Sequence, residues 1–153
     1  ETFMEDQYLK YIELLEHAVA SFYANTKQIH YMEKIRSVLE FMETHSEAHA
    51  EIIASSVQEN PMPALDPKQV INFQNSVLKD AEQLIKNEND VLIILDKLAY
   101  SEEALGDFYK SIAGSLKELS LHYSKVSEII SQIADDEYNH RDILLNDKER
   151  LKK

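Results

Sequence analysis

Apolar residues recur along most of this chain at the spacing of an α-helix. Leu9, Ile12, Val19 and Tyr23, for example, fall on one stripe because a helix turns once every 3.6 residues. Only two glycines and three prolines are present, far fewer turn residues than a β-rich fold needs. We therefore expect an all-α protein. Its long helices are predicted over residues 4–31, 33–58, 90–117 and 121–150.

All three prolines lie in ENPMPALDP, residues 59–67, which is the clearest break in the helical pattern. A further helical segment should begin after it, with Asp66 as the N-cap and Pro67 at the first helical position. We expect the polar stretch NEND, residues 87–90, to separate this segment from the third long helix. Four long helices with one long crossover, between the second and the third, are the plan of a four-helix bundle. If NEND were helical, the merged rod would force two chains to exchange it, and both arrangements stay open.

The composition suits one domain over residues 1–153, since 44% of the residues are hydrophobic and a chain of this length buries enough surface to fold without cross-links. The longest apolar run, VLIIL at residues 91–95, is much shorter than the roughly 20 residues of a membrane span. A net charge of −12 would repel a phosphate backbone. We therefore expect a soluble, cytoplasmic protein that binds neither nucleic acid nor membranes.

The first and third predicted helices share a sequence pattern. LLEHAVASFYANT at residues 14–26 matches YSEEALGDFYKSI at residues 100–112 on the common Phe-Tyr pair. This match places Glu16 opposite Glu102.

The second and fourth predicted helices also match. HSEAHAEII at residues 45–53 corresponds to DEYNHRDIL at residues 136–144, which places His49 opposite His140. The offset between the halves changes from the first match to the second, and we assign the difference to the turn between the helices. Each half is thus predicted to be a helical hairpin with a carboxylate on its first helix and a histidine on its second.

Three carboxylates are predicted on the apolar faces of these helices. Glu137 and His140 form an ExxH pair, whose members share a helix face with Ile133, and Glu16 and Glu102 lie on similar stripes. A buried carboxylate costs several kcal/mol unless it is protonated, paired or bound to a cation. The chain has no cysteine, so any metal would be held by histidines and carboxylates, which favours iron or manganese and also suits zinc.

The repeated segment ExAxxxFY, followed one helix later by an inward histidine and once by a full ExxH, resembles the rubrerythrin-type members of the ferritin-like superfamily. The resemblance implies a ferritin-like four-helix bundle that holds two iron ions. By this resemblance the terminal carboxylate ligands would be Glu16 and Glu102, the bridging ligand Glu137, the imidazole ligands His49 and His140, and the tyrosines that hydrogen-bond the carboxylates Tyr23 and Tyr109.

The first half departs from the family's pattern beside His49. Where the family has a second bridging glutamate, this chain has Ser46, and a further glutamate of the family is replaced by Leu105. His45 lies about 40° from His49 around the helix, so it either replaces the missing ligand or packs against the core. With one carboxylate fewer, a single metal, an asymmetric pair or zinc also becomes compatible with the site.

Two functions of different classes follow. The first is a non-haem di-metal oxidoreductase, with two iron ions, that reduces peroxide or dioxygen or oxidises iron. Since the chain lacks the four cysteines of a rubredoxin-like module, a separate electron donor would be required. The second is a ferritin-like bundle with a degenerate or mononuclear site, acting as a binding or scaffold module. In either case we expect a homodimer paired through an apolar flank.

Overall fold

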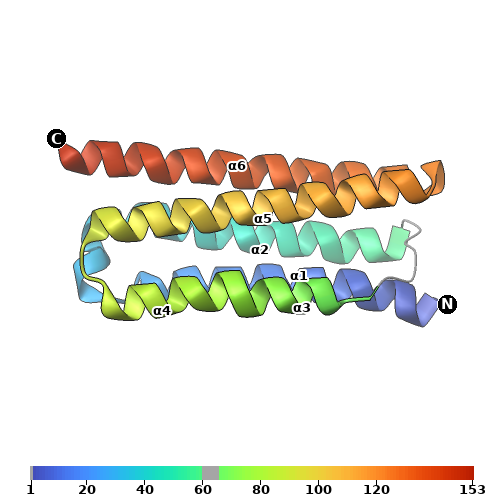
Figure 1. Cartoon of the computed structure of the whole chain (residues 1–153), viewed down its shortest axis with the longest axis horizontal. Coiled ribbons are helices and arrows are strands. Elements are labelled where there is room, and N and C mark those ends of the chain that lie inside the picture. The colour runs from blue at the N-terminus through green and yellow to red at the C-terminus, as the bar shows by residue number, and fades with distance from the viewer. Residues whose placement is uncertain (1, 60–65) are drawn as a thin grey trace.

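The computed structural model of this chain describes residues 2–59 and 66–153, and the side chains of residues 9–29, 32–56 and 66–153. Four long helices lie side by side (Figure 1). They are α1 (Thr2–Thr26), α2 (Arg36–Glu59), α5 (Val91–Leu119) and α6 (Ser124–Lys152). The described residues contain no strand, which confirms the all-α prediction.

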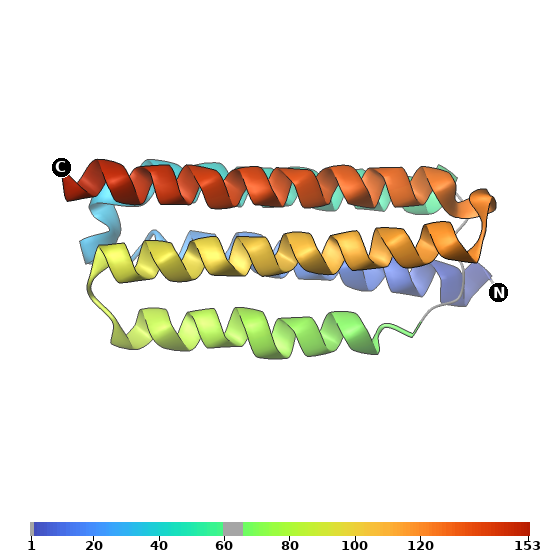
Figure 2. The same cartoon turned by 45° about the horizontal axis from the view of Figure 1, so that its top comes forward.

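A shorter helical segment connects the two halves. It consists of α3 (Lys68–Phe73), a single π-helical stretch, η2 (Gln74–Leu78), and α4 (Lys79–Asn87). Figure 2 shows this crossover segment running along the outside of α1 and α5. It carries the chain back along the length of the molecule, so α5 runs in the same direction as α2.

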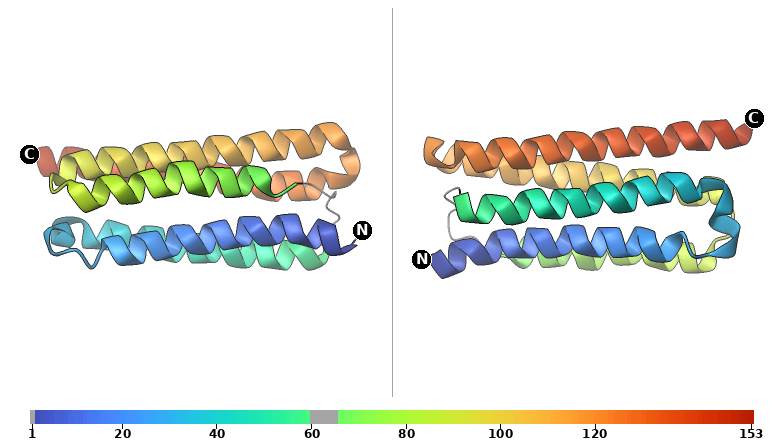
Figure 3. Two further views of the ribbon diagram at one scale, coloured as in Figure 1. Left: turned by 60° about the horizontal axis from the view of Figure 1, so that its bottom comes forward. Right: turned by 180° about the vertical axis from the view of Figure 1, so that it is seen from behind.

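The long helices form two antiparallel hairpins, α1 with α2 and α5 with α6 (Figure 3). Their buried apolar side chains make one continuous core, to which the crossover segment contributes Val70, Leu78, Ala81 and Ile85. At Gly106 the α5 backbone approaches α6 so closely that a Cβ atom would lie 2.6 Å from the Tyr138 ring. None of the described helices combines the length and the apolar character needed to cross a membrane.

The first helix ends earlier than the apolar pattern predicts. A helix was expected to continue to residue 31, but α1 ends at Thr26, whose hydroxyl donates a hydrogen bond to the Phe22 carbonyl at 2.8 Å. Ile29 is extended, and the 3₁₀ helix η1 (His30–Ile35) leads into α2. Apolar residues in this turn pack on the core and continue the pattern without the helix, which explains the misplaced boundary.

The crossover segment ends as expected but begins one residue later. Its first helix, α3, starts at Lys68 with Pro67 at the N-cap, where Asp66 was expected. Asp66 still accepts a hydrogen bond from the Lys68 amide at 3.0 Å. At the other end, residues 88–90 are not helical, and Asp90 caps α5 by accepting a bond from the Leu92 amide at 2.9 Å. The NEND break is therefore real, and the alternative of a merged rod is wrong. Of the proline-containing stretch, residues 60–65 lie outside the described part of the chain.

The length difference between the hairpins lies in the helices, which corrects the expectation that it lies in the turn. The connection between α1 and α2, residues 27–35, is in fact longer than the connection between α5 and α6, residues 120–123. The second hairpin is longer because α5 and α6 extend further beyond the matched segments. The α5–α6 connection contains the short 3₁₀ helix η3 (Leu121–Tyr123).

Candidate metal centre

Each of the four long helices brings at least one polar side chain into the core. Glu16 comes from α1, His49 from α2, Glu102 from α5, and both Glu137 and His140 from α6, and all five are at most 2% exposed. Each sits on the apolar stripe of its helix, so the burial that packs the stripe also buries the polar group. The structure thus brings together five of the six predicted ligands.

Two carboxylate–imidazole pairs form the sides of the cluster. His49 Nδ1 lies 2.9 Å from Glu16 Oε1, and His140 Nδ1 lies 2.9 Å from Glu102 Oε1. Each pair joins the two helices of one hairpin. The matched halves of the sequence therefore place equivalent residues in equivalent contacts.

Glu137 lies between the two pairs and is unsatisfied. Its Oε1 atom is 3.1 Å from His140 Nδ1 and 3.5 Å from His49 Nδ1, yet neither carboxylate oxygen has a hydrogen-bond partner among the described residues. Both imidazole nitrogens are directed at the other carboxylates instead. Buried polar atoms without partners are rare in native proteins and call for an explanation such as a bound ion.

Glu137 also belongs to both groups of residues that could hold a metal ion. One group is Glu16, His49 and Glu137, the other is Glu102, Glu137 and His140, and within each the ligand atoms lie within 4.8 Å of one another. A residue shared by two such groups lies within reach of both. The described residues therefore offer two adjacent positions for a cation.

Burial and neighbouring carboxylates raise the pKa values of Glu137 and Glu102. Burial raises the pKa of Glu137 well above its usual range, and the negative charges of Glu16 and Glu102 raise it further. Burial also raises the pKa of Glu102, which the hydrogen bond from His140 partly counteracts. Without a cation, protons must take up part of the negative charge.

For His49, the combined effect of nearby carboxylates on the pKa is larger than the effect of burial. Burial lowers its pKa, but the carboxylates of Glu16, Glu137 and Asp136 together raise it to about 9. The imidazole is therefore protonated at neutral pH. A divalent cation among these carboxylates would displace this proton and supply the positive charge in its place.

The outer nitrogens of the two histidines have different partners. His49 Nε2 lies 3.0 Å from Asp136 Oδ2, whereas His140 Nε2 lies 3.2 Å from His45 Nδ1. Sequence analysis missed Asp136, although the match between the halves aligns it with His45. That alignment, together with the rule that ligating histidines bond outward to a carboxylate or carbonyl, could have identified it.

His45 lies outside both groups of inward-facing residues. Its half-buried ring packs against the tilted ring of Phe41, with centroids 3.9 Å apart. Burial lowers its pKa, and His140 and His49 add to the effect. Ser46, which aligns with Glu137, is buried at 1% exposure and supplies no carboxylate. The prediction that His45 binds a metal stays a prediction, and in this structure its Nδ1 atom contacts the outer nitrogen of His140, Nε2.

The two predicted tyrosines, Tyr109 and Tyr23, differ in their hydrogen bonds. Tyr109 Oη donates a 2.7 Å hydrogen bond to Glu16 Oε2, in the way the resemblance implies. Its counterpart Tyr23 is equally buried, but the described side chains include no hydrogen-bond partner for its hydroxyl. Burial raises the pKa of both hydroxyls well above the usual value, so both are neutral donors.

The donor set fits a divalent transition metal. Three carboxylates and two imidazoles converge, with no thiolate, and such ligands suit iron, manganese or zinc. No family model, curated protein or solved structure matches this chain. The assignment of a function therefore depends on the geometry of the site.

Proposed function

We propose that this chain is a ferritin-like, rubrerythrin-type protein that binds two metal ions, most suitably iron, and reduces peroxide or dioxygen. The observation that carries the proposal is Glu137, whose two buried oxygens lack hydrogen-bond partners in the described part of the chain at the point where two ligand groups meet. Binding of cations by Glu137 would satisfy both oxygens. The sequence resemblance and the matched hairpins support the same reading.

In this proposal each hairpin supplies one end of the site. Glu16 and His49 would hold one ion, Glu102 and His140 the other, and Glu137 would bridge them. Asp136 accepts the Nε2 proton of His49, which leaves Nδ1 free as a ligand. His45 Nδ1 accepts the corresponding proton of His140.

The chemistry requires electrons from outside this chain. When bound, two ferrous ions supply the two electrons that reduce one hydrogen peroxide, with two protons, to two waters. The chain contains no cysteine, so a separate reductant would return the electrons. Tyr109 keeps Glu16 oriented through its hydrogen bond, and the surrounding apolar core limits the entry of water.

A second candidate is a ferritin-like bundle with a degenerate or mononuclear site. Two observations favour it. Ser46 leaves the centre with one bridging carboxylate, and the pairs His49–Glu16 and His140–Glu102 already satisfy one another. In that case protonation of Glu137 would replace the metal, and the protein would act as a binding or scaffold module.

Metal content distinguishes the two candidates. The protein is loaded with ferrous iron under anaerobic conditions and desalted, and iron per chain is measured by elemental analysis. The di-metal proposal expects two ions per chain, loss of iron in Glu137→Gln, and unchanged content in Asp135→Asn, which alters an exposed carboxylate on the same helix. One ion or none in the unmodified protein would favour the second candidate. If two ions bind, peroxide consumption with a chemical reductant tests the activity.

A further inference from the structure

The two ends of the centre differ in what lies beside their glutamates. At one end Tyr109 closes the approach to Glu16 with a hydrogen bond. At the other end, Glu102 and Tyr23 line a small cavity of ≈ 20 Å³ instead. The missing hydrogen bond and the cavity thus occur at the same end.

The cavity suits a small molecule of low polarity. Its volume is close to the roughly 10–15 Å³ that one water molecule needs by the same kind of measure. Apart from Glu102, Tyr23 and Ser101, its walls are apolar, and the Ser101 hydroxyl already donates to the Lys97 carbonyl. Water needs two to four polar partners to be held in such a space, and here Glu102 and Tyr23 offer only the minimum of two. A weakly polar guest, which the apolar walls also favour, therefore competes with water for the cavity. The apolar wall residues are Val19, Phe22, Phe73, Val77, Leu78 and Leu105.

A larger groove lies directly outside this cavity. It has a volume of ≈ 390 Å³ and runs between α1 and the crossover segment. Its rim carries exposed residues, among them Ser21 and Glu82, so it opens to solvent. Phe22 and Leu78 line both the groove and the inner cavity.

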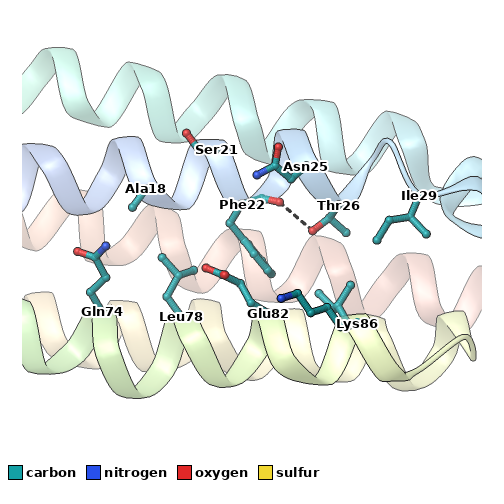
Figure 4. A pocket seen from close by; sticks show the side chains of 11 residues that line it. Ala18, Ser21, Phe22, Asn25, Thr26, Ile29, Gln74, Leu78, Glu82 and Lys86 are labelled. Carbon is teal, nitrogen blue, oxygen red and sulfur yellow. Dashed lines mark hydrogen bonds between the residues drawn. The ribbon is translucent and has the colours of Figure 1, made fainter.

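Phe22 and Leu78 are therefore the partition between the two spaces. Figure 4 shows Phe22 extending from α1 and Leu78 from the opposite segment into the space between them. Both are only 6% exposed. They belong to different elements, so a rotamer change or a small shift of the crossover segment would join groove and cavity.

We propose that dioxygen enters the metal centre through this groove, passes between Phe22 and Leu78, and lodges in the cavity beside Glu102. Tyr23 is its hydrogen-bond donor there, because its buried hydroxyl lies in the cavity wall and has no other partner among the described side chains. This inference rests on the proposed function. It adds that oxidant approaches the Glu102 end of the site and not the Glu16 end.

Xenon binds in apolar cavities and therefore tests this cavity independently of any metal. Crystals of the metal-free protein are pressurised with xenon, and the anomalous signal is mapped. A xenon atom between Tyr23, Leu105 and Leu78 is the expected result. A cavity that stays empty, or that holds an ordered water under ambient conditions, would overturn the proposal.

The passage is tested by the rate at which dioxygen oxidises the ferrous-loaded protein. Leu78→Trp should slow this oxidation by about tenfold at unchanged iron content, because entry then limits the reaction, and Leu78→Ala should not slow it. Ile71→Trp adds the same bulk at an exposed position of α3 and should match the unmodified protein. Equal rates in Leu78→Trp and Ile71→Trp would refute the route.

The two levels of the argument can fail separately. If no iron binds, the proposed function is wrong, and the xenon experiment still reports on the cavity. If iron binds but Leu78→Trp reacts at the normal rate, only the entry route is wrong. Tyr23→Phe supplies a third readout: the xenon site should remain, while oxidation slows because the donor is lost.

Discussion

Replacing Glu137 by glutamine should change stability in opposite directions with and without metal. In the metal-free protein, Glu137 lies at most 4.8 Å from ligand atoms of Glu16 and Glu102. At that distance, with an effective dielectric constant of about 20, each pair of carboxylates repels by about 3.5 kcal/mol. Charged His49, 3.5 Å away, offsets about 4–5 kcal/mol of this.

The balance is a net repulsion of about 2 kcal/mol for an ionised Glu137, in addition to the cost of burying its charge. Burial and this repulsion together raise the pKa of Glu137. Protonation relieves this repulsion but itself costs free energy at neutral pH, so Glu137 destabilises the metal-free protein in either state. Glutamine has nearly the same shape and no charge. We therefore expect Glu137→Gln to raise the free energy of unfolding of the metal-free protein by about 1–3 kcal/mol, which raises its Tm by roughly 3–9 °C for a chain of this size.

With metal bound, the unmodified protein should become more stable than Glu137→Gln. Each bound ion at a hundredfold excess over its Kd stabilises the folded protein by about 2.7 kcal/mol, and the variant loses this contribution because it lacks the bridging carboxylate. The assay is thermal unfolding by circular dichroism, with chelator and then with a divalent metal, for the unmodified protein, Glu137→Gln and the surface control Asp135→Asn. A variant that is less stable in chelator and equally stabilised by metal would refute the reasoning.

Three further predictions follow from the structure. Ser46→Glu should raise the metal content or affinity while lowering the Tm of the metal-free protein, because a fourth buried carboxylate then lacks a cation; elemental analysis and thermal melts measure both effects. Gly106→Ala should lower the free energy of unfolding by about 1–3 kcal/mol, since its Cβ would meet the Tyr138 ring. The control Gly114→Ala, whose Cβ would have nothing within 4 Å, should be neutral or stabilising by up to about 1 kcal/mol. Denaturant unfolding compares the two variants, and equal losses of stability would contradict the close packing at Gly106. The metal-free protein should lose about 3 kcal/mol of stability as the pH rises from 6.5 to about 9, because the pKa of His49 is raised in the folded state, and a stability that rises over this range would contradict the proton on His49.

Parts of the site were predictable because its residues repeat. Glu16 and Glu102, and likewise His49 and His140, occupy matching positions in two similar hairpins, and helical periodicity alone places each on an apolar face. Asp136 was missed because its role depends on the outer nitrogen of a histidine in the other hairpin. Periodicity within one helix carries no information on such a contact. The position of His45 was left open for the same reason.

Helical spacing and capping act over a few residues, so the local chain is enough to predict the helices, the crossover and the inward direction of the buried carboxylates. The packing of whole helices against one another places Glu137 between two histidine–carboxylate pairs with no partner among the described residues. The same packing brings Tyr109 to Glu16, whereas Tyr23 borders a cavity. These features depend on the depth and register at which helices from different hairpins pack. A shift of about an ångström between two packed helices is enough to turn a hydrogen bond into an empty space. The sequence pattern within one helix does not specify such a shift.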